Sequence, residues 1–241
     1  RKNGFRYASI DKHTIKEAVQ WADVVHLMEG FPFEATTAKI ARQLGKPCVG
    51  TYHIFTENIT ANLGNGRSTF INKLIDKWWS NSVYNHCKYV QCPTQTVKEH
   101  LEANGYTSEL RVISNGIDLS QTPSTISEPS TPPYRILCVG RLSNEKDQTT
   151  LIKAIRYSKY ADKIELVFAG NGPKANKIKS AARKLFEDGV VKHEPTFGFY
   201  TLKQLQELAA SSWLYVHCAK IEVEGLSCLE AIQQGLVPVI V

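Results

Sequence analysis

The chain has 241 residues, which is enough for one large domain or two ordinary ones. Its composition, 42% hydrophobic and 22% charged, is that of a soluble globular protein. The net charge of +6 is mild and no stripe of Lys and Arg concentrates it, which argues against a nucleic-acid binder. A mild positive charge suits anionic small molecules or an anionic membrane surface.

Six cysteines are spread singly along the chain, several of them inside apolar runs such as Cys138 in RILCVG. This pattern predicts buried thiols in a reducing compartment, not a disulfide framework. The sequence has no run of eighteen apolar residues and no signal-peptide pattern, so we expect a cytoplasmic protein. It starts with Arg1 and stops within the strand-like GLVPVIV, which suggests that both domains are incomplete.

In the first half of the chain, short β-branched runs alternate with helical patterns, which predicts βαβ units and a parallel sheet. We expect helices over residues 14–22, 34–45, 68–87 and 94–105, and strands over 23–28, 46–53, 88–93 and 109–114.

The helix predicted over 68–87 carries a helical stripe of apolar residues at positions 70, 71, 74, 75, 78 and 79. We expect this stripe to pack against the sheet. The alternative is an amphipathic helix that docks on a membrane, formed by Trp78 and Trp79 with Lys73, Lys77 and Arg67.

Residues 119–134, LSQTPSTISEPSTPPY, break the alternation and predict a linker, because Pro, Ser and Thr dominate. The alternation then restarts. We expect strands over 135–140, 164–170, 190–194, 213–218 and 238–241, and helices over 148–158, 174–186, 202–211 and 226–235. The predicted fold class is α/β, with two Rossmann-like parallel-sheet domains, 1–118 and 135–241, facing across a cleft.

Two loops of the second half have features of a phosphate site. In RILCVGRLSNEKD the strand ends at Gly140, and Arg141 and Lys146 are cations that can neutralise a diphosphate. In FAGNGP, residues 168–173, a Gly-rich turn follows a strand and lets the backbone approach a nucleotide. The alternatives are solvated loop charges and a plain strand-to-helix turn, because no dinucleotide fingerprint is complete.

The stretch IEVEGLSCLEAIQQG places a helix start between Glu222 and Glu230. The backbone amides around Gly225, Leu226 and Ser227 are expected to be unpaired there, which makes an anion site suited to a diphosphate. Glu230 can accept hydrogen bonds from a ribose diol, and Glu222 from a sugar hydroxyl. The alternative is a chance pair of glutamates near a helix N-terminus.

Other chemistries fit the sequence less well. His86, Cys87 and Cys92 form the tightest cluster of metal-ligating residue types, but their spacing matches no zinc pattern, so we expect no metal site. GLSCL does not complete the nucleophile-elbow pattern of a serine hydrolase.

Taken together, GRLSNEK, GNGP and EVEGLSCLE, in this order, resemble the donor-binding domain of the retaining GT-B glycosyltransferases of family 4. In the first half, ADVVHL, GTYH, CPTQTVKEHL and RVISNGID resemble the acceptor-side segments of that family. The resemblance covers nearly the whole chain. It makes residues 1–118 the acceptor-side domain and 135–241 the nucleotide-sugar donor-binding domain.

The resemblance also implies roles for particular residues. Glu222 would contact the transferred sugar, Glu230 the ribose, and His53 would face the cleft beside the reacting sugar. The implied site residues are catalytic Glu222, His53, Arg141 and Lys146, and donor-binding Gly140, Arg141, Lys146, Asn171, Gly172, Thr196, Gly225, Leu226, Ser227 and Glu230. Val223 and Glu224 depart from the Gly-Phe pair that follows the first Glu in many members, which leaves open whether Glu222 or Glu224 meets the sugar.

We therefore expect a metal-independent hexosyltransferase without a cofactor, which moves a sugar from a UDP-sugar or GDP-sugar to a lipid or saccharide acceptor in envelope glycolipid or polysaccharide synthesis. The chain contains no Asp-x-Asp, which fits metal independence. A looser resemblance of TYHIFTENI and CPTQTV to bacterial diacylglycerol glucosyltransferases implies a lipid-linked acceptor and peripheral contact with the inner face of the membrane. The alternatives are a non-catalytic two-domain ligand-binding protein and, less well supported, an NAD-dependent Rossmann enzyme.

Overall fold

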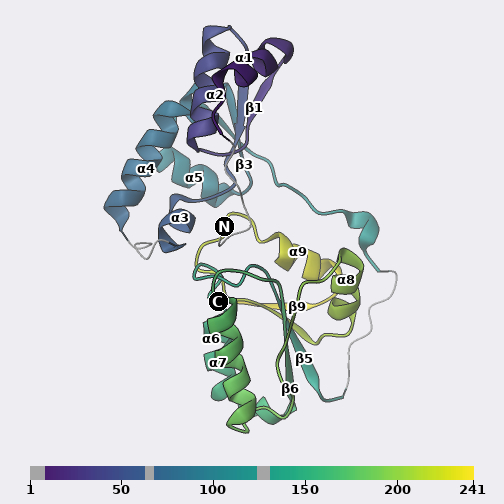
Figure 1. Cartoon of the computed structure of the whole chain (residues 1–241). Coiled ribbons are helices and arrows are strands. Elements are labelled where there is room, and N and C mark those ends of the chain that lie inside the picture. The colour runs from purple at the N-terminus through teal and green to yellow at the C-terminus, as the bar shows by residue number, and fades with distance from the viewer. Residues whose placement is uncertain (1–8, 63–67, 124–130) are drawn as a thin grey trace. The chain divides into compact units, whose positions relative to one another are not determined.

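The computed structural model describes residues 9–62, 68–123 and 131–241. By its internal contacts the chain divides into two compact units. Among the described residues, the N-terminal unit contains 9–115 together with 222–224, and the C-terminal unit contains 116–221 and 225–241. Each unit is a parallel sheet covered by helices (Figure 1).

The sheet of the N-terminal unit has four parallel strands in the order β1-β2-β3-β4. The strands are β1 (Val25–Leu27), β2 (Cys48–Thr51), β3 (Tyr89–Cys92) and β4 (Glu109–Val112). The helices are α1 (Lys12–Trp21), α2 (Pro32–Gln43), α3 (Thr56–Asn62), α4 (Thr69–Ser82) and α5 (Gln95–Ala103), with a 3-10 turn at Tyr84–His86. The sequence patterns predict each of these elements except α3, whose polar TENITAN has no apolar period.

Local sequence explains where these helices begin. The Asp11 carboxylate accepts a hydrogen bond from the His13 N–H at the start of α1, and Thr94 Oγ1 accepts one from the Val97 N–H at the start of α5. Each helix then buries one side, such as Ile15 and Val19 of α1, in a single apolar core.

Helix α4 uses its apolar residues differently from the expectation, because it has two apolar rows on different faces. Trp79 is buried and packs at the edge of the Tyr52 ring. The row one position earlier on the helix stays exposed: Phe70, Leu74 and Trp78 are 71%, 52% and 42% exposed. The prediction that the whole stripe packs against the sheet is therefore wrong for this outer row, since one helix presents less than half its circumference to a core.

The C-terminal unit has five parallel strands in the order β7-β6-β5-β8-β9. The strands are β5 (Tyr134–Val139), β6 (Ile164–Ala169), β7 (Thr196–Gly198), β8 (Leu214–His217) and β9 (Val237–Ile240). The helices are α6 (Gln148–Arg156), α7 (Ala175–Glu187), α8 (Leu202–Ala210) and α9 (Leu226–Gln233), with 3-10 turns at Leu119–Gln121 and Ala161–Lys163. Together with the first sheet, this confirms the predicted α/β class with two parallel sheets.

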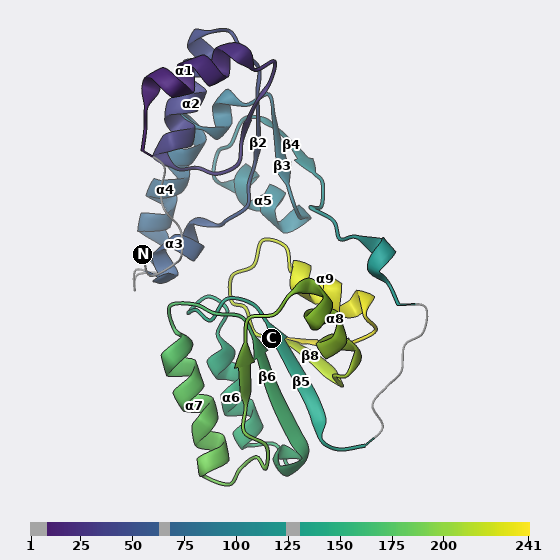
Figure 2. The same ribbon diagram turned by 45° about the vertical axis from the view of Figure 1, so that its right-hand side comes forward.

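The alternation of side chains along β5 separates two cores. Ile136 and Cys138 point into the core that α6 and α7 cover, and Leu137 points into the core under α8 and α9. Figure 2 shows the two helix pairs on opposite sides of the sheet. From β5 the chain adds β6 and β7 on one side of the sheet and then β8 and β9 on the other. The point where the strand order reverses therefore lies between β5 and β8. Open parallel sheets bind ligands at such a point, beyond the carboxyl ends of the strands.

Two expectations need correction or restriction. Residues 190–194 are not a strand, because the N–H groups of Val190 and Val191 donate to the Leu185 carbonyl and close the end of α7; the strand follows at Thr196–Gly198. Of the predicted linker, residues 119–121 form a 3-10 turn and Tyr134 already belongs to β5. Its residues 124–130, and Arg67 of the proposed membrane helix, lie outside the described residues.

The six cysteines are all buried free thiols, as their positions in apolar runs predict. Burial raises the pKa of Cys87 and of Cys138 to about 12. In the part of the chain that the structure describes, no helix has both the length and the apolarity to cross a membrane.

Candidate functional site

The loops after β5 and β6 are held together by their backbones at the carboxyl edge of the sheet. The Leu142 N–H donates to the Asn171 carbonyl at 3.1 Å, and the Lys174 N–H donates to the Leu142 carbonyl at 2.9 Å. A Cβ at Gly170, which has a φ of 149°, would lie 2.1 Å from the Gly140 oxygen. The glycines of FAGNGP are therefore required by contact between these two loops.

Arg141 and Lys146 lie on the loop between β5 and α6, beside the switch in strand direction, and both are half-buried. The Gln148 side-chain amide donates to the Arg141 carbonyl at 2.8 Å, which closes the loop on itself. The Lys220 N–H, after β8, donates to the Glu145 carbonyl at 2.8 Å. These bonds fix the basic loop between the ends of the two strands that border the switch.

Helix α9 begins at the same edge, directly after Gly225. Gly225 gives the helix no side-chain cap, and its carbonyl already accepts the Cys228 N–H at 2.8 Å. Within the described part of the chain, the N–H groups of Leu226 and Ser227 meet no acceptor, so the positive end of the helix is open to an anion. The Ser227 hydroxyl lies 2.8 Å from the Tyr215 hydroxyl, which anchors the helix start to β8.

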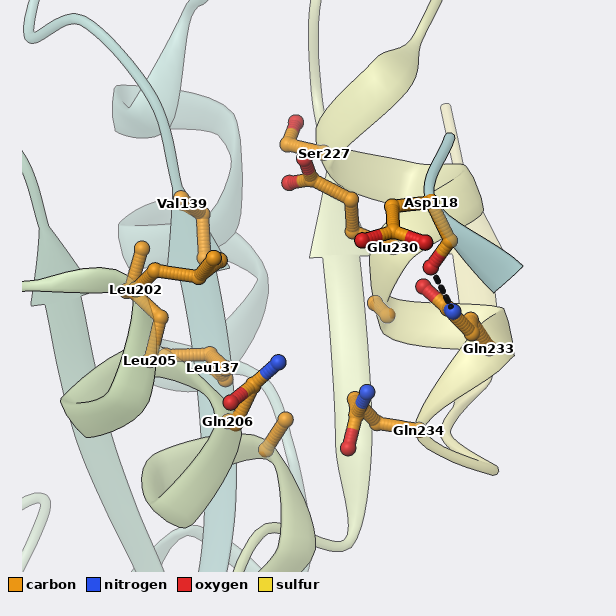
Figure 3. A pocket seen from close by; sticks show the side chains of 12 residues that line it. Asp118, Leu137, Val139, Leu202, Leu205, Gln206, Ser227, Glu230, Gln233 and Gln234 are labelled. Carbon is orange, nitrogen blue, oxygen red and sulfur yellow. Dashed lines mark hydrogen bonds between the residues drawn. The ribbon is translucent and has the colours of Figure 1, made fainter. Parts of the chain in front are cut away.

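Ser227 and Glu230 open onto a cavity of about 110 Å³ between α8, α9 and the sheet. Figure 3 shows Val139, Leu202 and Leu205 on one wall, opposite Ser227 and Glu230. The polar wall is completed by the loop that enters the C-terminal unit, because the Gln233 side-chain amide donates to the Asp118 carbonyl at 2.6 Å. The cavity thus combines a flat apolar side with hydrogen-bonding groups at a helix start.

Two other residues implied by the resemblance, His53 and Glu222, belong to the N-terminal unit, as does Glu224. His53 follows β2, and burial and the neighbouring His26 lower its pKa, while the charge of Glu224 opposes this. Within this unit, the Glu224 carboxylate accepts hydrogen bonds from the Ser114 hydroxyl at 2.5 Å and from the Asn115 N–H at 2.9 Å. Glu224 is thus held by Ser114 and Asn115 of the loop that follows β4.

Within the C-terminal unit, the structure brings most of the predicted residues together and separates Thr196 from them. Gly140, Arg141, Asn171 and Gly172 share the joined loops, and Gly225, Leu226, Ser227 and Glu230 share the start of α9. Thr196 stands apart, because it pairs in register with Val167 in the middle of β6, two positions before the strand's carboxyl end. It does not line the cavity.

Sequence patterns did not indicate the apolar wall. Leu202 and Leu205 belong to α8, and only the packing of that helix decides which of its leucines face Glu230. Asp118 is the last residue of RVISNGID, one of the segments that resemble the acceptor side of the family. Among the residues that the structure describes, no group of three or more His, Cys, Asp or Glu side chains is arranged to hold a metal ion.

A parallel, Rossmann-like sheet with a basic, Gly-rich loop and an open helix N-terminus at its switch point defines a protein of the doubly wound α/β class. Two family models cover the chain nearly end to end: Glycosyltransferase Family 4 matches residues 2–121, and Glycosyl transferases group 1 matches residues 123–241. The chain belongs to the family 4 glycosyltransferases.

Individual relatives agree with this assignment. The Alpha-monoglucosyldiacylglycerol synthase of Streptococcus pneumoniae is 26% identical over 227 residues, which are 88% of this chain and 50% of that protein. The chain thus spans about half the length of this curated relative. The crystal structure of Anabaena HepE in complex with UDP and glucose superposes with a TM-score of 0.72 over 99% of this chain and 65% of that one, at 17% identity. This likeness confirms the predicted GT-B type of fold.

The catalytic domain of the Helicobacter pylori cholesterol-alpha-glucosyltransferase is 47% identical over a shorter alignment. It covers 45% of this chain and 64% of that chain, with a TM-score of 0.38.

Proposed function

We propose that this chain forms the catalytic part of a retaining glycosyltransferase that takes a sugar from a nucleotide-sugar donor. The observation that carries the proposal is the open N-terminus of α9, whose Ser227 and Glu230 line a cavity at the switch between β5 and β8. The basic loop with Arg141 and Lys146 leaves the sheet at the same switch. Anion-binding amides, fixed cations and an apolar wall together match a nucleoside diphosphate.

Each part of the donor has a counterpart among these residues. Arg141, Lys146 and the amides of Leu226 and Ser227 hold the diphosphate, since charge-assisted hydrogen bonds are the strong ones. Glu230 accepts hydrogen bonds from the ribose hydroxyls. The apolar wall of Leu202 and Leu205 receives the flat face of the base.

The reaction breaks the bond between the sugar's anomeric carbon and the diphosphate, forms a bond to the acceptor oxygen with retention of configuration, and releases the acceptor's hydroxyl proton. Arg141 and Lys146 stabilise the charge that develops on the leaving diphosphate, so we propose a metal-independent reaction. Glu222 contacts the transferred sugar and His53 the reacting side of it. With its pKa lowered by burial, His53 is neutral near pH 7 and suited to hydrogen bonding.

The relatives suggest the class of donor and acceptor. The HepE structure contains UDP and glucose, and the Streptococcus pneumoniae relative is named a synthase of a glucosyldiacylglycerol. We propose a UDP-hexose or GDP-hexose as donor and a lipid or saccharide as acceptor, in glycolipid or polysaccharide synthesis.

The exposed row of α4 supports peripheral membrane contact at the cytoplasmic face. Phe70, Leu74 and Trp78 recur every fourth residue, so they lie along one face of the helix. The exposed Lys73 and Lys77 flank this row. Apolar side chains beside lysines are the pattern of a helix that lies on an anionic lipid surface.

The test is calorimetric binding of UDP and GDP to the intact polypeptide that carries this sequence. We expect one nucleotide to bind, and Arg141→Ala with Lys146→Ala to weaken it by at least about a hundredfold, since two charge-assisted contacts are lost. The control, Lys153→Ala with Arg156→Ala on the exposed side of α6, removes the same residue types and should leave binding unchanged.

Failure of both nucleotides to bind would overturn the proposal and favour a ligand-binding protein with another ligand. Turnover separates the two classes further. A transferase slowly hydrolyses its nucleotide sugar when no acceptor is present, whereas a binding protein releases its ligand intact.

A further inference from the structure

The hydroxyl of Tyr215 lies at the switch between β5 and β8, where three segments of the C-terminal unit meet. Tyr215 pairs in register with Leu137, and its side chain is fully buried. Its hydroxyl oxygen lies 2.8 Å from Ser227 Oγ in the first turn of α9, 3.4 Å from the Val139 carbonyl oxygen at the end of β5, and 3.4 Å from His217 Nδ1 on β8. One buried hydroxyl thus joins the two strands that border the switch to the helix whose start is open.

The strongest of these contacts is the one with Ser227. A hydrogen bond between two hydroxyls is normally about 2.7 to 2.8 Å long, so the bond to Ser227 is a full one and the contacts at 3.4 Å are weak. The ring of Tyr215 lies in the apolar core under α8 and α9. A phenylalanine would fill that core as well, so packing alone does not explain the hydroxyl. What the hydroxyl adds is its bond to Ser227.

The direction of this bond decides what Ser227 offers to the candidate donor cavity, whose wall it forms (Figure 3). Each of the two hydroxyls carries one proton. If Ser227 donates to Tyr215, its oxygen turns only lone pairs toward the cavity. If Tyr215 donates to Ser227, the Ser227 proton is left for a ligand. An anion only accepts hydrogen bonds, so a bound diphosphate selects the second direction.

His217 extends the same chain of hydrogen bonds. Its Nδ1 faces the Tyr215 hydroxyl, and one tautomer of the imidazole carries a proton on that nitrogen. In that tautomer His217 donates to Tyr215, Tyr215 donates to Ser227, and Ser227 donates to the anion. His217 and Tyr215 are both buried, so these bonds form in a medium of low dielectric constant, where each strengthens the next.

We propose that Tyr215 is a positioning residue for the leaving diphosphate. Its hydroxyl donates to Ser227 and thereby makes the Ser227 hydroxyl a donor to the diphosphate, beside the N–H groups of Leu226 and Ser227. The inference rests on the proposed function, since it needs a diphosphate at the start of α9. Negative charge on the diphosphate grows as its bond to the sugar breaks, so this donor contributes more in the transition state than in the bound nucleotide sugar.

The first test compares a ligand that has a diphosphate with one that lacks it. We expect Tyr215→Phe to weaken calorimetric binding of UDP, or of GDP if that is the nucleotide bound, by about tenfold. The matching nucleoside, measured as a competitor of the bound nucleotide, should bind as it does to the wild type. Tyr134→Phe is the matched control, because it removes a hydroxyl at the first residue of β5, away from the carboxyl edge, and should change neither affinity.

A double-mutant cycle tests whether Tyr215 acts through Ser227. In the Ser227→Ala background the hydroxyl that Tyr215 orients is gone, so Tyr215→Phe should cause no further loss. A residue that merely packs would weaken the nucleotide by the same factor in both backgrounds, and the nucleoside with it. Slow hydrolysis of the nucleotide sugar gives a second readout: in Tyr215→Phe, kcat should fall by a larger factor than KM rises.

The inference is overturned if Tyr215→Phe leaves nucleotide affinity unchanged, if nucleoside and nucleotide lose equally, or if the loss is the same with and without the Ser227 hydroxyl. When the intact wild-type polypeptide binds neither UDP nor GDP, the proposed function fails and the inference fails with it. When a nucleotide binds and Arg141→Ala with Lys146→Ala weakens it, but Tyr215→Phe does not, the proposed function stands and only the role of Tyr215 is wrong.

Discussion

Glu29 stands in the loop between β1 and α2 with one carboxylate oxygen buried and without a hydrogen-bond donor among the described residues. Burial and, to a lesser extent, the charge of Glu34 raise the pKa of this carboxyl to about 7. The folded protein therefore holds a proton on Glu29 at pH values where the unfolded chain has released it. Stability contributed by the neutral carboxyl is present at low pH and falls as pH rises from about 4.5 through 7.

We expect Glu29→Gln to raise the free energy of unfolding at pH 8 by about 1 kcal/mol, after allowance for solvent screening, and to leave it unchanged at pH 5. The reason is that glutamine never carries the charge whose burial is unfavourable. Chemical denaturation at both pH values measures this. Equal effects at pH 5 and pH 8 would show that the carboxyl is not the cause.

At the scale of elements, α4 packs one side against the core of the N-terminal unit and exposes apolar side chains on the other. Its inner side places the buried Asp76 among the hydroxyls of Tyr52, Thr56 and Tyr106, each of which donates to the carboxylate at 3.2 or 3.3 Å. These bonds fix the helix relative to the segment after β2, which leads to His53. The outer side is therefore held firmly in its exposed orientation.

We expect Phe70→Ser, Leu74→Ser and Trp78→Ser together to abolish binding to vesicles that contain anionic lipid, with little change in the free energy of unfolding, because all three side chains are already exposed. Sedimentation with vesicles at low and high salt measures this, since the contribution of Lys73 and Lys77 is screened by salt. Trp21→Ser is the control, as Trp21 is an exposed aromatic residue of α1. Equal loss in the control would mean that any exposed aromatic residue suffices and that α4 has no special part.

At the scale of the molecule, each unit has its own core. One cluster centres on Tyr52 and Trp79 in the N-terminal unit, and two clusters on either side of β5 serve the C-terminal unit. All proposed contacts with the diphosphate and ribose lie in the C-terminal unit. A nucleotide should therefore stabilise that unit directly.

We expect UDP or GDP, whichever binds, to slow amide hydrogen exchange at residues 140–146 and 225–230 of the intact protein. Saturation to about a hundred times Kd adds about 2.7 kcal/mol to the stability of the binding unit. Hydrogen exchange read by mass spectrometry measures this. Unchanged exchange in both segments, with the nucleotide bound, would place the donor site elsewhere.

Much of the fold could be predicted, because short stretches of sequence determine where most of its strands and helices form. Val25–Leu27 and Tyr134–Val139 are strands in apolar, β-branched runs, and the Gly-rich turns end strands where the pattern predicts. The prediction of a strand over residues 190–194 was wrong because the β-branched valines there close the end of α7. Backbone hydrogen bonds decide where a helix ends, and a run of residue types does not reveal them.

The sequence by itself determined the family, the parallel α/β architecture and the residues around the start of α9, because motif order and hydrophobic period are properties of the chain. Only the tertiary structure decided which groups meet: Leu202 and Leu205 with Glu230, and Tyr215 with Val139. It also decided that Trp79 is buried while Trp78 is exposed. These neighbours lie far apart in the sequence or differ by one helical step, and only packing of helices on the sheets fixes which of them meet.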